Sequence, residues 1–173
     1  MVTTARPAAR PLVAALASVA AAALASCAPP TGAPPAAPAV GSGTPPVTAA
    51  GFDYGPVKTP AEYLADPELA GADPARGELL ALACAACHSF DAGGKAIVGP
   101  NLHGVFGRPA ATVPDFAYSP ALRASGLVWT PRSIEAWLAD PARFVSGTTM
   151  TFTGYQSATD RRDLIAYLLR ATN

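Results

Sequence analysis

The pattern of hydrophobic and polar positions divides the chain into an apolar front, a proline-rich stretch and a helical remainder. In the remainder, apolar residues recur at spacings of three and four, and no alternating stretch of useful length occurs, so the pattern predicts helices and no strands. Three predicted helices begin with a polar cap residue followed by proline, which has no backbone N–H to leave unpaired. These starts are Asp73-Pro74, Ser119-Pro120 and Thr130-Pro131.

The expected helix ends follow from the same chemistry. The first helix should run to about Ala86, the second should stop near Gly126, and the third must end before Pro141. A fourth helix is predicted from near Ser157, with an apolar face through Leu164, Tyr167, Leu168 and Ala171. The loops between these helices are long, and a helix bundle with so few apolar residues needs something else at its centre.

The front of the chain is typical of an export signal. Arg6 and Arg10 precede an apolar stretch from Leu12 to Leu24, whose thirteen residues span roughly 20 Å as a helix. That length is short of the roughly 30 Å hydrocarbon core and fits a signal peptide better than a membrane-spanning helix. The stretch closes with Leu24-Ala25-Ser26-Cys27, which resembles a bacterial lipobox and implies lipidation of Cys27. A plain signal peptide or an uncleaved anchor is the alternative.

Residues 28–60 are mainly Pro, Ala, Gly, Thr and Ser, and such a segment cannot bury enough apolar surface to offset its ordering entropy. We interpret it as a linker that is partly extended because of its proline content. The role of Phe52 to Pro67 stays open between packing on the domain and belonging to the linker. The expected organisation is a signal peptide over 1–26, a lipidated cysteine and linker over 27–70, and one domain over 71–173.

Composition narrows the possible partners and frameworks. The 173 residues include 12 basic and 12 acidic side chains, so no overall basic field favours nucleic acid as a partner. Three cysteines are too few and too oddly numbered for a disulfide framework. The length suits one ordinary domain.

The stretch Cys84-Ala85-Ala86-Cys87-His88 matches the attachment motif for c-type haem. Two thiols three residues apart suit the two vinyl groups of haem, and the next histidine is placed to ligate the iron. A thioredoxin-like redox motif would need a βαβ context, which the pattern lacks. A zinc site would need two more ligands, while His103 is the one other histidine. A Cys84–Cys87 disulfide would leave His88 unexplained.

The second iron ligand decides whether the remaining coordination position of the iron is filled by a side chain or is open to another molecule. Beyond the signal region, Met150 is the one methionine, and it lies in a polar segment with no helical period. A thioether opposite a histidine is the ligand pair of cytochromes c. The competing ligand is His103, which would give a bis-histidine haem.

From about Gly71 to the end, the chain resembles a class I cytochrome c of the mitochondrial and alphaproteobacterial type. The matching pieces lie in the family's order and at its spacing: Cys84–His88, Gly99–Arg108, Gly126–Trp129, Ser146–Gly154 and Asp163–Leu168. The resemblance implies an all-α fold of about four helices and long loops around one covalent haem c.

The resemblance also implies roles for individual residues. His88 and Met150 are the expected iron ligands, and Cys84 and Cys87 the expected thioether attachments. The carbonyl of Pro100 is expected to accept a hydrogen bond from the His88 imidazole. The remaining expected contacts are to the propionates and the haem edge, from Arg108, Tyr118, Trp129, Thr148 and Phe152. The first and last helices are expected to cross at Gly77 and the Leu164–Tyr167 face.

By this resemblance the protein is expected to be an electron carrier and not an enzyme, with iron cycling between Fe(II) and Fe(III). The expected donor is a cytochrome bc-type complex, and the expected acceptor is a haem-copper oxidase or another periplasmic reductase. The lipid on Cys27 would hold it on the periplasmic side of a bacterial membrane. Lys95 is the single lysine from residue 72 onward, so long-range steering should be weak. A permanently docked haem subunit, or an open-site haem enzyme or gas sensor, are the alternatives.

Overall fold

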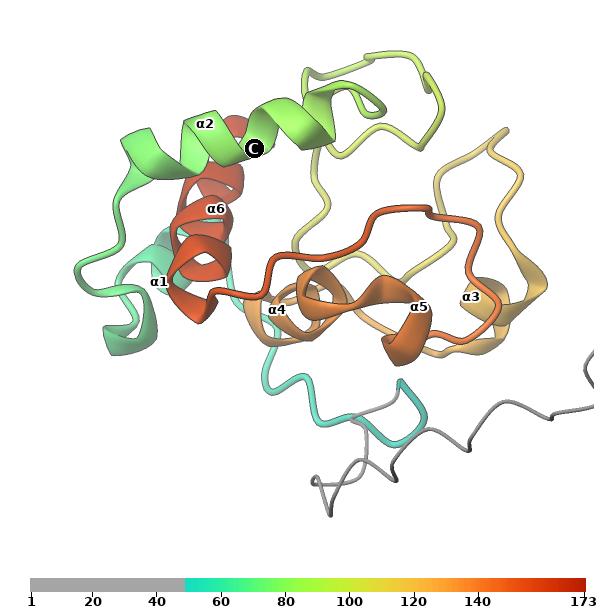
Figure 1. Cartoon of the computed structure of the whole chain (residues 1–173), viewed down its shortest axis with the longest axis horizontal. Helices are drawn as coiled ribbons and strands as arrows, with labels where there is room; N and C mark the ends of the chain where they lie inside the picture. The colour runs from blue at the N-terminus through green and yellow to red at the C-terminus, as the bar shows by residue number, and fades with distance from the viewer. Residues whose placement is uncertain (1–48) are drawn as a thin grey trace, which may run out of the picture. The chain divides into compact units, whose positions relative to one another are not determined.

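The computed structural model describes residues 49–173, and this part of the chain is helical (Figure 1). No strand forms within it; Pro109 and Val128 make one isolated antiparallel bridge. None of its helices is long and apolar enough to cross a membrane. The predicted signal peptide, Cys27 and the linker as far as residue 48 lie outside the described residues. The elements are α1 (Pro60–Leu64), the 3₁₀ turn η1 (Pro67–Leu69), α2 (Pro74–Ala85), α3 (Pro120–Ala124), α4 (Pro131–Ala139), α5 (Pro141–Phe144) and α6 (Ala158–Ala171).

Five of these α-helices begin with a capping side chain followed by proline. At α2 the Asp73 carboxylate accepts hydrogen bonds from the first free backbone N–H groups, at 2.9 and 3.2 Å. The three starts predicted from the sequence, and the start of α6 after Ser157, are confirmed. The same chemistry at Thr59 and Asp140 begins α1 and α5, which the pattern did not predict because helices of five and four residues show no apolar period.

The crossing of α2 and α6 is the central packing contact, and Figure 1 shows α2 lying across α6. The helices meet at Gly77, where a Cβ atom would contact the backbone carbonyl of Asp163 and lie 2.8 Å from Cβ of Tyr167. Glycine is therefore the residue that permits this approach. The Asp163 carboxylate accepts a hydrogen bond of 2.9 Å from the backbone N–H of Asp73, which ties the start of α2 to α6. The predicted crossing is confirmed.

Residues 49–70 pack on the rest of the described chain. The Phe52 ring meets the Phe144 ring edge-on with centroids 5.1 Å apart, and the Ala49 N–H donates to the Phe144 carbonyl at 2.9 Å. Tyr63 is buried, and its hydroxyl donates to the Pro56 carbonyl at 3.0 Å. Phe52 to Pro67 therefore packs on the domain and does not belong to the linker. The folded part of the chain begins before residue 71.

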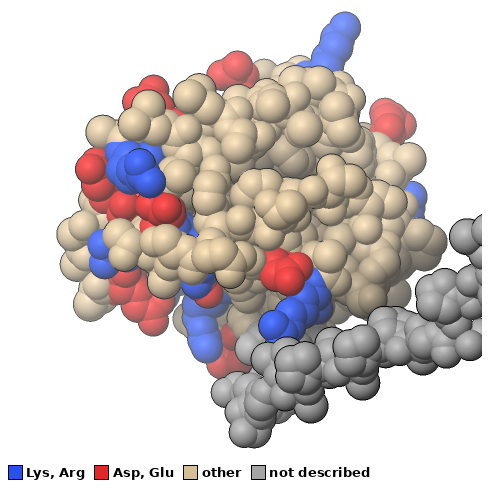
Figure 2. Space-filling model, in the orientation of Figure 1, with Lys and Arg blue, Asp and Glu red and all other residues tan. Residues whose placement is uncertain are grey.

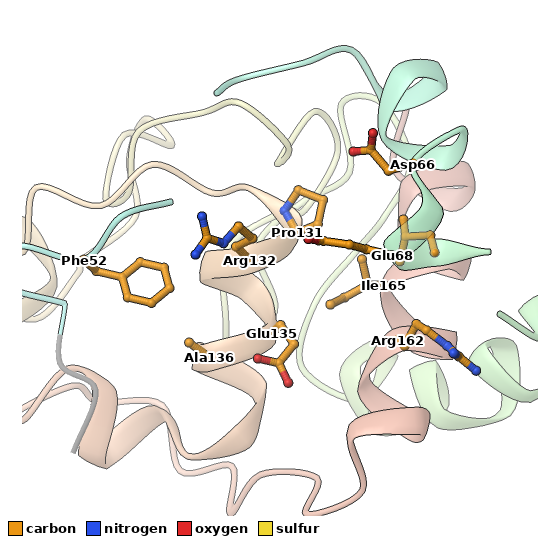
Figure 3. Close-up of a pocket in the computed structure, with 10 residues that line it drawn as sticks. Phe52, Asp66, Glu68, Pro131, Arg132, Glu135, Ala136, Arg162 and Ile165 are labelled. Carbon is orange, nitrogen blue, oxygen red and sulfur yellow. The ribbon is translucent and has the colours of Figure 1, made fainter. Parts of the chain in front are cut away.

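A cavity of about 420 Å³ remains between this segment and helices α4 and α6 (Figure 3). Its charged side chains come from all three elements, but several are engaged in ion pairs. Arg132 pairs with Asp53 at 3.1 Å, and Glu135 pairs with Arg161 at 2.6 Å. Most of the charged groups in this cavity are thus held in ion pairs, while, within the part of the chain that the structure describes, Glu68 is in none and Nε of Arg162 is buried without a hydrogen-bond partner.

Candidate functional site

A second cavity, of about 400 Å³, contains the residues that the sequence pointed to. Its walls come from the end of α2, from α4, from the long loop between α2 and α3, and from the segment between α5 and α6. All ten predicted cofactor-binding residues line it: Cys84, Cys87, His88, Pro100, Arg108, Tyr118, Trp129, Thr148, Met150 and Phe152. The structure thus brings together one set of side chains from positions spread over almost seventy residues.

The two thiols lie where α2 ends. Cys84 is in the last turn of the helix, and the N–H groups of Cys87 and His88 donate to its carbonyl at 3.0 and 2.9 Å. This tight turn places both sulfurs on one wall. Burial, together with the neighbouring Cys87, raises the pKa of the Cys84 thiol to about 11. Within residues 49–173, the two cysteines form no disulfide, and no cluster of three His, Cys, Asp or Glu side chains could hold a metal ion.

The loop after His88 folds back and fixes the imidazole. The N–H groups of Val98 and Gly99 donate to the Cys87 carbonyl at 3.2 and 2.8 Å, which brings Pro100 beside the ring. Nδ1 of His88 lies 2.7 Å from the Pro100 carbonyl oxygen, so with a proton on Nδ1 it donates and Nε2 keeps its lone pair. Burial lowers the pKa of His88, partly opposed by this hydrogen bond, and so favours the neutral ring that a metal needs.

Gly99 is pressed against that ring. A Cβ atom at this position would lie 2.7 Å from Nδ1 and 2.8 Å from Nε2 of His88. Any side chain there would push the imidazole away from its present orientation. Gly99 lies in one of the segments that carry the family resemblance, but nothing in the sequence signals its contact with the ring.

Arg108 holds the loop that follows. Its guanidinium donates to the carbonyls of His103 at 2.8 Å and Asn101 at 3.1 Å, and burial lowers its pKa. The Asn101 amide in turn donates to Ser89 at 2.8 Å, so the loop is bound to the residue after His88. His103 does not line the cavity, which leaves the bis-histidine alternative without structural support.

Met150 enters from the segment between α5 and α6. Its backbone N–H donates to the Thr148 hydroxyl at 3.3 Å, an arrangement that holds a local turn. Phe152 packs edge-on against Tyr155 with centroids 5.1 Å apart, and the Tyr155 hydroxyl donates to the Leu80 carbonyl on α2 at 2.8 Å. The Met150 segment is therefore tied directly to the helix that carries the cysteines.

Several apolar walls of the cavity were not predicted as site residues. Trp137 packs edge-on against Trp129 with centroids 5.3 Å apart, and both line the cavity. The sequence does contain a signal for the wall residues on α4, because their spacings of three and four define an apolar helix face. The missed wall residues on helices are Ala83, Leu122, Ile134, Trp137, Leu138 and Leu168.

A family model described as cytochrome c matches residues 74–172, more than half of the chain. The chain belongs to the cytochrome c family. It is similar to a cytochrome c of Theileria annulata, with 42% identity over 102 residues, or 58% of this chain and 88% of that protein. It is also similar to cytochromes c2 of Rhodoblastus acidophilus (43% over 96 residues, 56% of this chain and 90% of that protein) and Blastochloris viridis (41% over 99 residues, 57% and 78%).

Membership of the cytochrome c family confirms four predictions. Its members are electron carriers and not enzymes, and they bind one haem c covalently through cysteines. The predicted all-α fold is also that of the family, although six α-helices form within residues 49–173 where about four were expected. The residues present fit this group: two thiols beside an oriented imidazole, a thioether on the same cavity, and a largely apolar lining.

Proposed function

We propose that this cytochrome c is a membrane-tethered, single-haem carrier that passes single electrons between respiratory complexes. One observation supports the carrier role above the others. Cys84, Cys87, His88 and Met150 line one cavity, and the His88 ring is already oriented by the Pro100 carbonyl. A thiol pair, an imidazole and a thioether make up the complete donor set that a six-coordinate haem c needs.

In this proposal Cys84 and Cys87 would hold haem through thioether bonds, and His88 and Met150 would ligate its iron. Bound haem would supply an iron that cycles between Fe(II) and Fe(III). Pro100 accepts the hydrogen bond from Nδ1 of His88, which leaves Nε2 free for the metal and adjusts the basicity of the ring. With His88 and Met150 both serving as ligands, no ligand position would be left on the iron for a substrate.

The surrounding side chains keep water out and set the electrostatics of the cavity. Trp129, Trp137 and Phe152 line it with aromatic surface. Arg108 is the one permanently charged side chain in the lining, and it is held by two backbone carbonyls. Arg108 and Tyr118 are suited to interact with the propionates, and Thr148 to donate a hydrogen bond there.

The tether is part of the same proposal. The lipobox-like Leu24–Cys27 stretch supports lipidation of Cys27 and a place on the periplasmic side of a bacterial membrane. A proline-rich linker then lets the domain search near the membrane at a raised effective concentration. Electrons would come from a cytochrome bc-type complex and go to a haem-copper oxidase or another periplasmic reductase. Mass spectrometry of the membrane fraction tests the anchor, since a diacylglyceryl group on Cys27 is expected and an unmodified Cys27 would contradict it.

The carrier role is tested by the absorption spectrum of the reduced protein before and after addition of carbon monoxide. The spectrum should not change, because Met150 keeps the sixth position closed. The Met150→Ala variant is the positive control, and its spectrum should shift on addition of carbon monoxide. A clear shift in the unaltered protein would contradict the proposal and favour an open-site haem protein.

A further inference from the structure

Residues 49–55 contact the end of α5 and the start of α4, and we call these seven residues the clasp. The clasp begins with a turn in which the Phe52 N–H donates to the Ala49 carbonyl at 3.2 Å, and Gly51 supplies the positive φ of 71° within it. In Figure 1 the first coloured residues run below α5 and α4. The clasp lies outside residues 74–172, the part of the chain that the family model matches.

The contact of the clasp with α5 combines two rings and a backbone hydrogen bond. The Phe52 ring packs edge-on against Phe144, the last residue of α5. The Ala49 N–H donates to the Phe144 carbonyl at 2.9 Å, and both residues are buried. The last carbonyls of a helix have no partner within the helix, so this hydrogen bond satisfies one of them. The end of α5 is therefore held from outside the helix.

The contact of the clasp with α4 is made at the cap of that helix. The buried Thr130 hydroxyl donates to the Tyr54 carbonyl at 2.8 Å and accepts from the Ser133 N–H at 3.4 Å. The Arg132–Asp53 ion pair adds little, because both side chains are exposed. In Figure 2 the charged atoms of the visible face gather mainly toward the side where Figure 1 has α1 and the start of α6. The clasp thus holds mainly through hydrogen bonds and apolar contact.

A short series of contacts leads from the end of α5 to Met150. Val145, the residue after α5, is buried, and its carbonyl accepts from the Thr148 N–H at 3.0 Å. The Thr148 hydroxyl then accepts from the Met150 N–H. Beyond Met150, the Tyr155 hydroxyl binds α2. Met150 therefore lies between two fixed points, and the clasp holds the first of them.

We propose that the clasp positions Met150 and so keeps the sixth position of the haem iron closed. This inference rests on the proposed function, in which Met150 ligates that iron. Segments between helices open locally at a lower free energy than helices do. The fraction of molecules in which Met150 is displaced therefore depends on how firmly the ends of its segment are held. The competing interpretation is that the clasp only covers the Phe144 ring and stabilises the fold.

Imidazole binding to the oxidised, haem-loaded full chain measures how often Met150 is displaced. The apparent Kd equals the intrinsic Kd divided by the fraction of molecules that can bind. Phe52→Ala removes the ring contact with Phe144 and should lower the apparent Kd for imidazole about tenfold. Phe52→Leu keeps an apolar contact at this position and should recover most of the difference.

A matched pair of glycines gives a second test that leaves the aromatic rings intact. Gly51 and Gly71 have φ angles of 71° and 75°, and a Cβ atom at either would meet no atom of the described residues within 4 Å. Valine at either position therefore strains the backbone without a collision. Gly51→Val should tighten imidazole binding several-fold, because the strain lies in the clasp. Gly71→Val strains the chain between η1 and α2 and should change the apparent Kd less than about twofold.

Urea unfolding of the same variants separates positioning of Met150 from general stabilisation. Gly51→Val and Gly71→Val should lower the urea midpoint by similar amounts, while only the first changes imidazole binding. If both glycine variants tightened imidazole binding equally, or if neither Phe52→Ala nor Gly51→Val changed it, the proposal would be overturned. If Phe52→Ala does not fold, the glycine pair decides. A carbon monoxide complex of the reduced, unaltered chain would instead contradict the carrier function itself.

Discussion

Replacing Gly77 by alanine is a direct test of how closely α2 and α6 approach. The new Cβ would contact the Asp163 carbonyl oxygen and lie 2.7 Å from its carbon and 2.8 Å from Cβ of Tyr167. The helices would have to move apart, because backbone atoms cannot rotate out of the way, and overpacking of this severity lies at the upper end of the usual cost, about 3 kcal/mol. Alanine would gain about 1 kcal/mol of helix propensity over glycine, so a backbone collision should leave a net loss of roughly 2 kcal/mol.

The loss is measured by thermal unfolding of the haem-loaded protein, followed by circular dichroism. A folded part of this size has an unfolding entropy of roughly 0.26 kcal/mol/K, so a loss of about 2 kcal/mol should lower Tm by roughly 8 °C. Glu78, the exposed next residue on α2, supplies the control: Glu78→Ala should be more stable than Glu78→Gly by about 1 kcal/mol. If Gly77→Ala were neutral or stabilising like the control pair, the close crossing of α2 and α6 would be refuted.

Two further substitutions address the site and the N-terminal segment. Gly99→Ala should displace the His88 ring, lower the ratio of haem to protein absorbance in the purified chain and cost about 1–3 kcal/mol of stability; an unchanged ratio and stability would contradict the contact. Tyr63→Phe removes a hydroxyl that accepts from the Lys58 N–H and donates to the Pro56 carbonyl, so urea unfolding should show a loss of about 1–2 kcal/mol. Tyr54→Phe is its control and should change stability little, and equal losses would argue against the two hydrogen bonds of the Tyr63 hydroxyl.

Local chemistry explains which parts of the fold were predictable. A cap residue before proline specifies a helix start through two adjacent residues, so α2, α3 and α4 could be placed to within a residue or two. The stretch from Cys84 to His88 is likewise a local signal. α1 and α5 carry the same cap signal at Thr59 and Asp140, but their few residues add no period that would separate them from turns.

The features of the fold and of the site that the sequence did not predict depend on contacts between residues far apart in the chain. The apolar face of α4 was visible, yet no pattern shows that Ile134 and Leu138 face the haem cavity and not another helix. The segment over 49–70 has the composition of a linker, and its docking depends on two aromatic side chains meeting distant partners. Phe52 finds Phe144, and Tyr63 packs near Phe106 with ring centroids 6.4 Å apart.

The arrangement of charges shows why average properties do not reveal the electrostatics of the haem cavity. The chain has a formal charge of zero, but where the charges lie does not follow from that balance. Five ion pairs form within residues 49–173, and none of the paired side chains lines the cavity that contains Cys84 and Met150: Lys58–Asp66, Arg76–Asp160, Arg132–Asp53, Arg161–Glu135 and Arg162–Asp163. Arg108 is instead the one permanently charged side chain in the lining of that cavity, and two backbone carbonyls hold it in place. The charge nearest the proposed haem therefore comes from one fixed guanidinium, which neither the net charge of the chain nor its composition reveals.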